Sequence, residues 1–203
     1  MKIFRNFLIF LVLFIVSAKA SDNEILDKVN RYLFSMDTYK ANFLQFSDGG
    51  DSAEGVFYIS RPDKLKFDYI NPFRSSLITN GKTTYYYDIE MDELTTIPSK
   101  KTPLLFLLKK KNSIRELGFD VVSIEKKDGK VYVTTKNKEI NELEDKNVIF
   151  VFDKNIEKLI GISIEDDMKN RIYVNFSNIE LNGKIDKSVF DVNFKKMKRK
   201  GKF

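Results

Sequence analysis

The chain has 203 residues and a formal net charge of +6, and it contains neither histidine nor cysteine. The usual general base, the usual zinc ligand and any thiol nucleophile are therefore missing, and no disulfide can form. The nine glycines are scattered and form no phosphate-binding loop. We expect no catalytic site, no metal and no cofactor.

The first twenty residues are typical of a secretory signal peptide. Lys2 and Arg5 precede an apolar run of about eleven residues, and residues 18–20 give the small-x-small pattern of a cleavage site. The run is too short to span a membrane. We therefore interpret residues 1–20 as a cleaved signal peptide and predict a periplasmic protein, with an uncleaved membrane anchor as the alternative.

The positive charge is concentrated at the two ends of the chain. Removing residues 1–20 lowers the formal charge to +3, and residues 195–203 hold six lysines and arginines. The stretch 21–194 is consequently slightly acidic, whereas a nucleic-acid-binding domain carries its basic stripe on the fold. We interpret 21–194 as one domain that binds no nucleic acid. The basic tail, 195–203, is interpreted as a solvated end rather than a contact with membrane phosphates or a partner.

The mature chain begins with an amphipathic pattern. Apolar residues over 22–40 recur at helical spacing, with Asp22 or Asn23 as a candidate N-cap. Alternating apolar and polar residues then predict strands, separated by turn signals such as Asn80-Gly81. The strands expected in this half cover 39–47, 55–61, 64–69, 75–80, 82–89 and 93–98.

The alternation is interrupted in mid-chain by residues 104–108, LLFLL, which lie between Pro103 and three lysines. This run is too evenly apolar for a half-exposed strand, so we expect a short helix starting near Pro103, a residue suited to a helix's first turn. Further strands are expected at 119–126, 130–136, 147–153, 158–166 and 170–181, and the segment ending near residue 192 is expected to close the sheet.

About ten to eleven antiparallel strands and two helices predict a mainly β protein, as a sandwich or a barrel. Eighteen phenylalanines are available to pack its interior. A barrel of roughly eight strands can be filled by its own side chains, and a wider one leaves space. The pattern alone therefore leaves two alternatives open: a plain aromatic core, or an apolar cavity under a helical cover.

The stretch 55–72, GVFYISRPDKLKFDYINP, together with 77–88, LITNGKTTYYYD, resembles the signature of the periplasmic outer-membrane lipoprotein carrier proteins, the LolA family. Phe43 and Gln45 match that family's Phe-x-Gln, and the apolar run after Thr102-Pro103 is similar to its mid-chain lid. The resemblance covers nearly the whole mature chain and is densest between residues 43 and 88.

The resemblance implies a half-open antiparallel β-barrel of about eleven strands, closed by a helical lid around an apolar cavity for acyl chains. It implies that Arg61 bonds backbone carbonyls of the lid and holds the empty form closed. Leu65 stands where the family has another apolar residue, and Phe67 where a tryptophan is common. The implied cavity residues are Phe43, Phe57, Leu65, Phe67, Tyr69 and Leu77, and the implied lid residues are Leu104, Leu105, Phe106, Leu107 and Leu108.

The family also implies the partners. Acylated lipoproteins would be received from an ABC-type release complex of the inner membrane and delivered to a receptor lipoprotein of the outer membrane, by a carrier expected to be a monomer. The main alternative is a periplasmic lipid-sensing or lipid-binding protein of the same fold. A hydrolase and an adhesive β-protein are the other classes considered, and the absence of histidine and cysteine disfavours the hydrolase.

Overall fold

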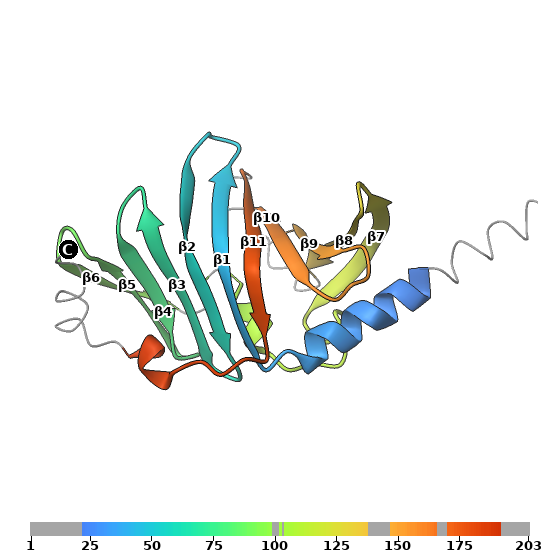
Figure 1. Ribbon diagram of the computed structural model, residues 1–203, viewed down its shortest axis with the longest axis horizontal. Helices are drawn as coiled ribbons and strands as arrows, with labels where there is room; N and C mark the ends of the chain where they lie inside the picture. Colours follow the sequence, from blue (N-terminus) through green and yellow to red (C-terminus); the bar gives the residue numbers. More distant parts are fainter. Residues whose placement is uncertain (1–21, 99–101, 103, 138–146, 166–169, 192–203) are drawn as a thin grey trace, which may run out of the picture.

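The computed structural model describes residues 22–98, 102, 104–137, 147–165 and 170–191. Its framework is one antiparallel sheet of eleven strands in the order β6-β5-β4-β3-β2-β1-β11-β10-β9-β8-β7 (Figure 1). β1 and β11 lie side by side in the centre, so each half of the chain builds one half of the sheet. The strands are β1 (Thr38–Ser47), β2 (Ser52–Ser60), β3 (Lys64–Asn71), β4 (Ser75–Thr79), β5 (Thr83–Asp88), β6 (Glu93–Pro98), β7 (Phe119–Lys127), β8 (Lys130–Asn137), β9 (Asn147–Asp153), β10 (Leu159–Glu165) and β11 (Arg171–Leu181).

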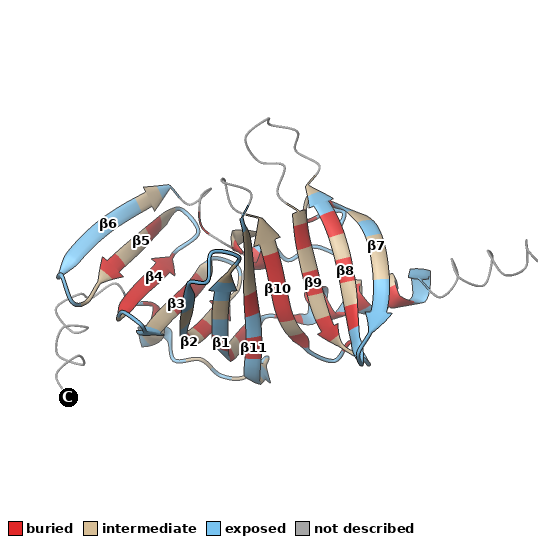
Figure 2. Ribbon diagram, turned by 90° about the horizontal axis from the view of Figure 1, so that it is seen from above, coloured by how far each residue is buried: buried red, intermediate tan, exposed pale blue. Residues whose placement is uncertain are grey.

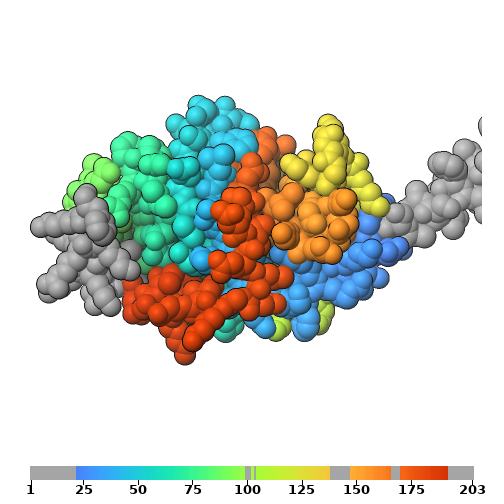
Figure 3. Space-filling view, in the orientation of Figure 1, coloured from blue at the N-terminus to red at the C-terminus, as the bar shows by residue number. Residues whose placement is uncertain are grey.

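The sheet is not closed, because β6 and β7 end it without pairing with each other. The prediction of an antiparallel sheet of about eleven strands is confirmed. The prediction that the segment near residue 192 closes the sheet is wrong. That segment forms a short 3-10 helix, η3 (Lys187–Phe190), on the outer face of the sheet beside β3 (Figures 1 and 3). Phe190 is buried there against Tyr58 and Lys64, so an aromatic contact, rather than strand pairing, fixes it.

The N-terminal helix covers residues 22–35 and is the only α-helix among the described residues. It includes both Asp22 and Asn23, so neither residue caps it as expected. It also ends five residues before the predicted end, because Thr38 already begins β1. None of the helices in the described ranges is long and apolar enough to cross a membrane.

The mid-chain helix predicted from Pro103 is reduced to one 3-10 turn, η2 (Leu105–Leu108). Leu104 has a φ of 58°, in the left-handed region, so the chain turns sharply before η2. Lys109 is extended directly after it. Residues 104–108 therefore lie as a tight turn, and Pro103 itself is outside the described residues.

Strict alternation along the strands produces the core. The inner face, by which we mean the face whose side chains join the main hydrophobic cluster, is buried, and the other face is more exposed (Figure 2). In β9, for example, Val148, Phe150 and Phe152 are buried, and the residues between them are half-buried. The N-terminal helix adds Ile25, Val29, Tyr32 and Leu33 to the same cluster.

Candidate functional site

The inner face brings together the residues expected to line a cavity. Phe43, Phe57, Leu65, Phe67 and Leu77 are buried on β1 to β4, and Tyr69 is half-buried at the far end of β3. The strand register accounts for this, since Ala41, Phe57, Phe67 and Leu77 occupy one row across four strands. Of the residues predicted for the lid, Leu104, Leu107 and Leu108 belong to the same cluster, and Leu105 and Phe106 pack against it half-buried.

The rings on this face form a continuous aromatic cluster. Phe57 lies 4.4 Å from Phe67 and 5.4 Å from Phe176 between ring centroids. Phe43 meets Phe67 and Tyr69 edge-on at 5.3 and 5.2 Å. Such pairs prefer edge-to-face or offset geometry and add to the energy of simple burial. An apolar surface therefore runs across β11, β1, β2 and β3.

Gly55 makes room for this cluster. It lies between Phe43 and Tyr69 in the strand register. A Cβ atom built on Gly55 would come 2.0 Å from the backbone oxygen of Asp68 and 3.0 Å from the Phe43 ring. Only a residue without a side chain fits here, because β2 and β3 approach closely at a register shift.

Arg61 stands at the opposite end of these strands, in the turn between β2 and β3. Its Nε donates to the backbone oxygen of Leu107 at 2.8 Å, and its Nη1 donates to the backbone oxygen of Leu33 at 2.7 Å. One guanidinium therefore joins η2 to the last turn of the N-terminal helix. Burial lowers the pKa of Arg61, and the neighbouring Asp37 carboxylate partly opposes this effect. Arginine keeps its charge in proteins, so both bonds are charge-assisted.

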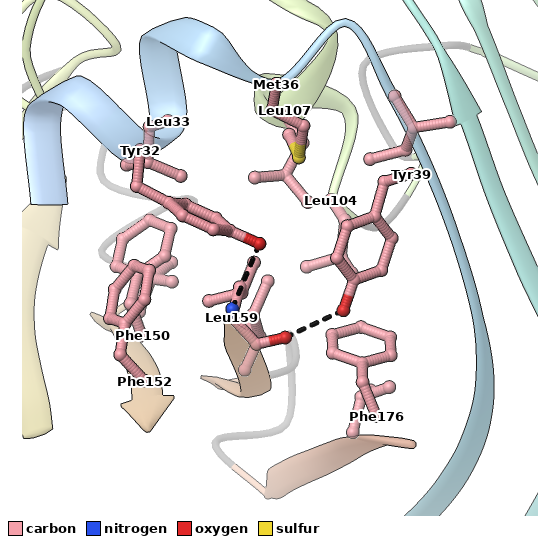
Figure 4. Close-up of a cluster of buried hydrophobic side chains, with 14 of the residues drawn as sticks. Tyr32, Leu33, Met36, Tyr39, Leu104, Leu107, Phe150, Phe152, Leu159 and Phe176 are labelled. Atoms are coloured by element: carbon pink, nitrogen blue, oxygen red, sulfur yellow. Dashed lines mark hydrogen bonds between the residues drawn. The ribbon is translucent and has the colours of Figure 1, made fainter. Parts of the chain in front are cut away.

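Two buried tyrosines, Tyr32 of the N-terminal helix and Tyr39 of β1, both bond to the backbone of Leu159 (Figure 4). The hydroxyl of Tyr32 accepts from the backbone nitrogen of Leu159 at 3.1 Å, and the hydroxyl of Tyr39 donates to the backbone oxygen of the same residue at 2.7 Å. The ring of Tyr32 also packs edge-on against Phe152 at 5.4 Å. Burial raises the pKa of Tyr32 to about 12 and raises that of Tyr39 further, so both hydroxyls stay protonated at neutral pH.

The end of the helix is held by a second set of contacts. The Oδ1 atom of Asn182 accepts from the backbone nitrogens of Asp37 and Thr38, and its Nδ2 atom donates to the backbone oxygen of Ser35. Lys110, just after η2, forms an ion pair of 2.6 Å with Asp37. The hydrogen bond from Lys110 lowers the pKa of the Asp37 carboxyl.

Most of these contacts were not predicted from the sequence. Arg61 was expected to bond backbone carbonyls of the lid. Its second partner, the backbone oxygen of Leu33, was not predicted, because the sequence does not indicate which backbone oxygens a side chain will reach. Tyr32 was interpreted as an apolar position of the helix, although its hydroxyl reaches Leu159. Asn182 was not singled out in the sequence. Its position after an 11-residue strand gave no indication that it would meet the end of a helix almost 150 residues earlier.

Within the described ranges, no cluster of three or more acidic side chains could hold a metal ion. Asp166 and Asp167, from the acidic turn after β10, lie outside the described residues, as do the expected signal peptide and the basic tail. One buried hydroxyl in the described part, that of Ser163, has no hydrogen-bond partner.

The chain is similar to a family of known proteins. The family model described as outer membrane lipoprotein carrier protein LolA matches residues 35–193, well over half of the chain. An outer-membrane lipoprotein carrier protein of Chromohalobacter salexigens is 28% identical over 173 residues, which cover 81% of this chain and 80% of that one. A protein of the same name from Azotobacter vinelandii is 25% identical over 200 residues, 94% of each chain.

Among solved structures, an uncharacterized conserved protein from Thermus thermophilus has a TM-score of 0.51. The match covers 84% of this chain and 92% of that one at 10% sequence identity. At that identity the likeness shows the fold alone.

Proposed function

Since the chain belongs to the LolA family of outer membrane lipoprotein carrier proteins, we propose that it shelters the acyl chains of lipoproteins on their way to the outer membrane. The observation that supports this most is the inner face, where the aromatic surface, the leucines of η2 and apolar residues of the N-terminal helix join one hydrophobic cluster. The acyl chains would bind there, against Phe43, Phe57, Leu65, Phe67 and Leu77, after the cover moves away.

The affinity of a preformed cavity for acyl chains would be too high for release, unless binding also had to open a closed form. A buried methylene contributes about 0.8 kcal/mol, so one chain of ~15 methylenes would gain on the order of 12 kcal/mol in a preformed cavity. Two or three such chains would never leave a rigid protein. If loading breaks favourable contacts of the closed form, that loss is subtracted from the affinity and release becomes possible.

Arg61 is the residue we assign to this balance. Its two bonds join the two covering elements, so a single side chain stabilises the closed form at both. Loading would separate η2 from the helix and break the bonds together. Arg61 then acts as a latch whose loss would make loading easier and unloading harder.

The setting follows from the family. Lipoproteins would come from an ABC-type release complex in the inner membrane and pass to a receptor lipoprotein on the outer membrane. We assign the carrier to the periplasm, as a monomer that reaches it by means of the signal peptide expected at residues 1–20. Residues 21–194 would form the carrier domain, followed by the basic tail. The carrier itself would use no cofactor and catalyse no reaction.

Native mass spectrometry of the protein purified from its own periplasm tests the proposal. We expect adducts whose masses correspond to acylated polypeptides, and these adducts should disappear when lipoprotein acylation is blocked. A protein that carries free lipids in place of acylated polypeptides would instead be a lipid-binding or lipid-sensing member of the same fold. A protein that carries nothing, and binds no fluorescent acyl probe, would contradict both functions.

A further inference from the structure

Two polar side chains, those of Gln45 and Tyr69, meet at the end of the inner face that is far from Arg61, and a third, Tyr86, stands one row nearer Arg61. Tyr69 follows Leu65 by four residues on β3, which places it ~13 Å further along the strand. Gln45 lies on β1, which is separated from β3 by β2. Tyr86 lies on β5 opposite Leu77, in the row of Phe67, and it adds to the effect of burial in raising the pKa of Tyr69. All three are half-buried at the edge of the aromatic cluster, where we call them the polar rim.

The hydrogen-bonding capacity of the polar rim is poorly used. The hydroxyl of Tyr69 donates to Oε1 of Gln45 at 3.4 Å, whereas such bonds are commonly about 2.7–2.8 Å. Within the described part of the chain, neither the amide nitrogen of Gln45 nor the hydroxyl of Tyr86 has a hydrogen-bond partner. Donors at the end of an apolar surface, with one weak bond among them, are free to bind an acceptor.

The charges nearby exclude an anionic acceptor. The inner-facing positions of β1 to β5, all within the described residues, include no lysine or arginine. The one charged residue among them is Asp88, whose Oδ1 accepts the backbone N–H groups of Glu90 and Met91. These inner-facing strand positions offer a phosphate no counter-charge, and Asp88 would repel it, so the rim suits a neutral oxygen.

We propose that the polar rim, formed by Gln45, Tyr69 and Tyr86, binds the carbonyl oxygens through which acyl chains join the head group of a lipoprotein. This inference rests on the proposed function and adds the chemistry that the carrier recognises beside the hydrocarbon. Every acyl chain ends in an ester or amide carbonyl, at the point where the apolar surface gives way to solvent. The chains would lie along the aromatic cluster, and their carbonyls would meet the rim.

Ester carbonyls also occur in phospholipids, and the two sources differ in charge. A lipopeptide with a diacylglyceryl cysteine has neutral ester groups next to a peptide. A phosphatidylglycerol with the same chains places a phosphate beside Asp88. The polar rim therefore selects the lipopeptide and disfavours the phospholipid.

The test is a set of equilibrium binding measurements on the full-length mature protein with three fluorescent probes of equal chain length. These are a diacylglyceryl-cysteine peptide, its dialkyl ether analogue, which has no ester carbonyls, and phosphatidylglycerol. We expect the ester peptide to bind about fivefold to tenfold more tightly than the ether, as one or two net hydrogen bonds would give. Phosphatidylglycerol should bind more weakly than the ester peptide.

The variants Tyr69→Phe and Tyr86→Phe keep both rings and should bring the ester affinity down to that of the ether, which should itself stay unchanged. Tyr132→Phe is the matched control, because Tyr132 is half-buried on β8 but lies between the core residues Val131 and Val133 and so faces outward. If the unsubstituted protein binds ester and ether equally, the polar rim does not bind carbonyls, whereas the carrier function is unaffected by that result. Equal binding of phosphatidylglycerol and the peptide would overturn the selection by charge. No binding of any probe would contradict the carrier function as well.

Discussion

The two ends of the inner face differ in how their polar groups are satisfied. At the Arg61 end, five short contacts converge on backbone atoms of Leu33, Leu107 and Leu159 and on Asp37, with distances from 2.6 to 3.1 Å. At the polar rim, the bond between Tyr69 and Gln45 is 3.4 Å long. At the Arg61 end the polar groups thus bond other parts of the protein and stabilise the closed form. At the polar rim, hydrogen-bond donors remain for a ligand. Substitutions at the two ends should therefore have different effects.

The largest effect is expected at Gly55, where the aromatic cluster meets the rim. Gly55→Ala would place a methyl group 2.0 Å from the Asp68 backbone oxygen, so β2 and β3 must separate. We expect the free energy of unfolding in urea to fall by about 3 kcal/mol or more. Gly183→Ala is the control, because its Cβ would have only ordinary contacts at 3.7 Å and beyond. Similar losses for both variants would show that β2 and β3 can separate at little cost.

A smaller effect is expected at the closed end from the tyrosine pair. Tyr32→Phe and Tyr39→Phe each leave one buried backbone group of Leu159 without its partner. Each should lower the free energy of unfolding by about 1–3 kcal/mol. Tyr132→Phe again serves as the control and should change stability by less than about 0.5 kcal/mol. If all three variants are equally stable, the bonds of Tyr32 and Tyr39 to Leu159 contribute nothing to the stability of the fold.

Alkaline pH should lower the stability that Tyr32 contributes at one end of the inner face and Tyr69 at the other. Burial raises the pKa of Tyr32 and of Tyr69 to about 12, from an ordinary value near 10. The unfolded chain therefore loses these protons before the folded one does, and the stability they contribute is present below pH ~10 and falls as the pH rises towards 12. Urea midpoints at pH 9 and 11.5 should decline less in Tyr32→Phe and Tyr69→Phe than in the unsubstituted protein. An unchanged decline in both variants would contradict the burial of these hydroxyls.

The smallest effect is expected from the exposed ion pair between Lys110 and Asp37. Both side chains face solvent, so salt screens their attraction. Lys110→Gln should lower the melting temperature slightly in dilute buffer and not measurably in ~0.5 M salt. A large loss that persists in salt would mean that Lys110 supports η2 by more than its charge.

The strand pattern was predictable from the sequence because alternation is a local property. β9 alternates Val148, Phe150 and Phe152 with half-buried residues, and the turn at Asp128-Gly129, with φ values of 51° and 71°, uses residues suited to positive φ. The mid-chain helix was not predictable in the same way. Residues 104–108 are strong helix formers, but the left-handed backbone at Leu104 and the demands of the core reduce them to one turn.

The site was predictable in its composition and not in its connections. The apolar residues of β2 and β3 and the position of Arg61 followed from the resemblance, since they lie in one continuous motif. The long-range contacts could not be predicted. Leu33 and Leu159 take part through backbone atoms, and Asn182 is far in sequence from the helix that it contacts. The polar rim was hidden because Gln45, Tyr69 and Tyr86 come from β1, β3 and β5, which are not adjacent in the sheet.

The most direct test of the account is the transfer of a loaded lipoprotein from Arg61→Leu to the outer-membrane receptor. We predict a folded variant that accepts lipoprotein at least as readily as the unsubstituted protein but transfers it at least about tenfold more slowly, since two charge-assisted bonds no longer favour the closed form. Arg115→Leu is the control, because Arg115 is exposed and pairs with Asp120 only at 3.6 Å, and it should transfer normally. Transfer by Arg61→Leu at the rate of the unsubstituted protein would contradict the latch.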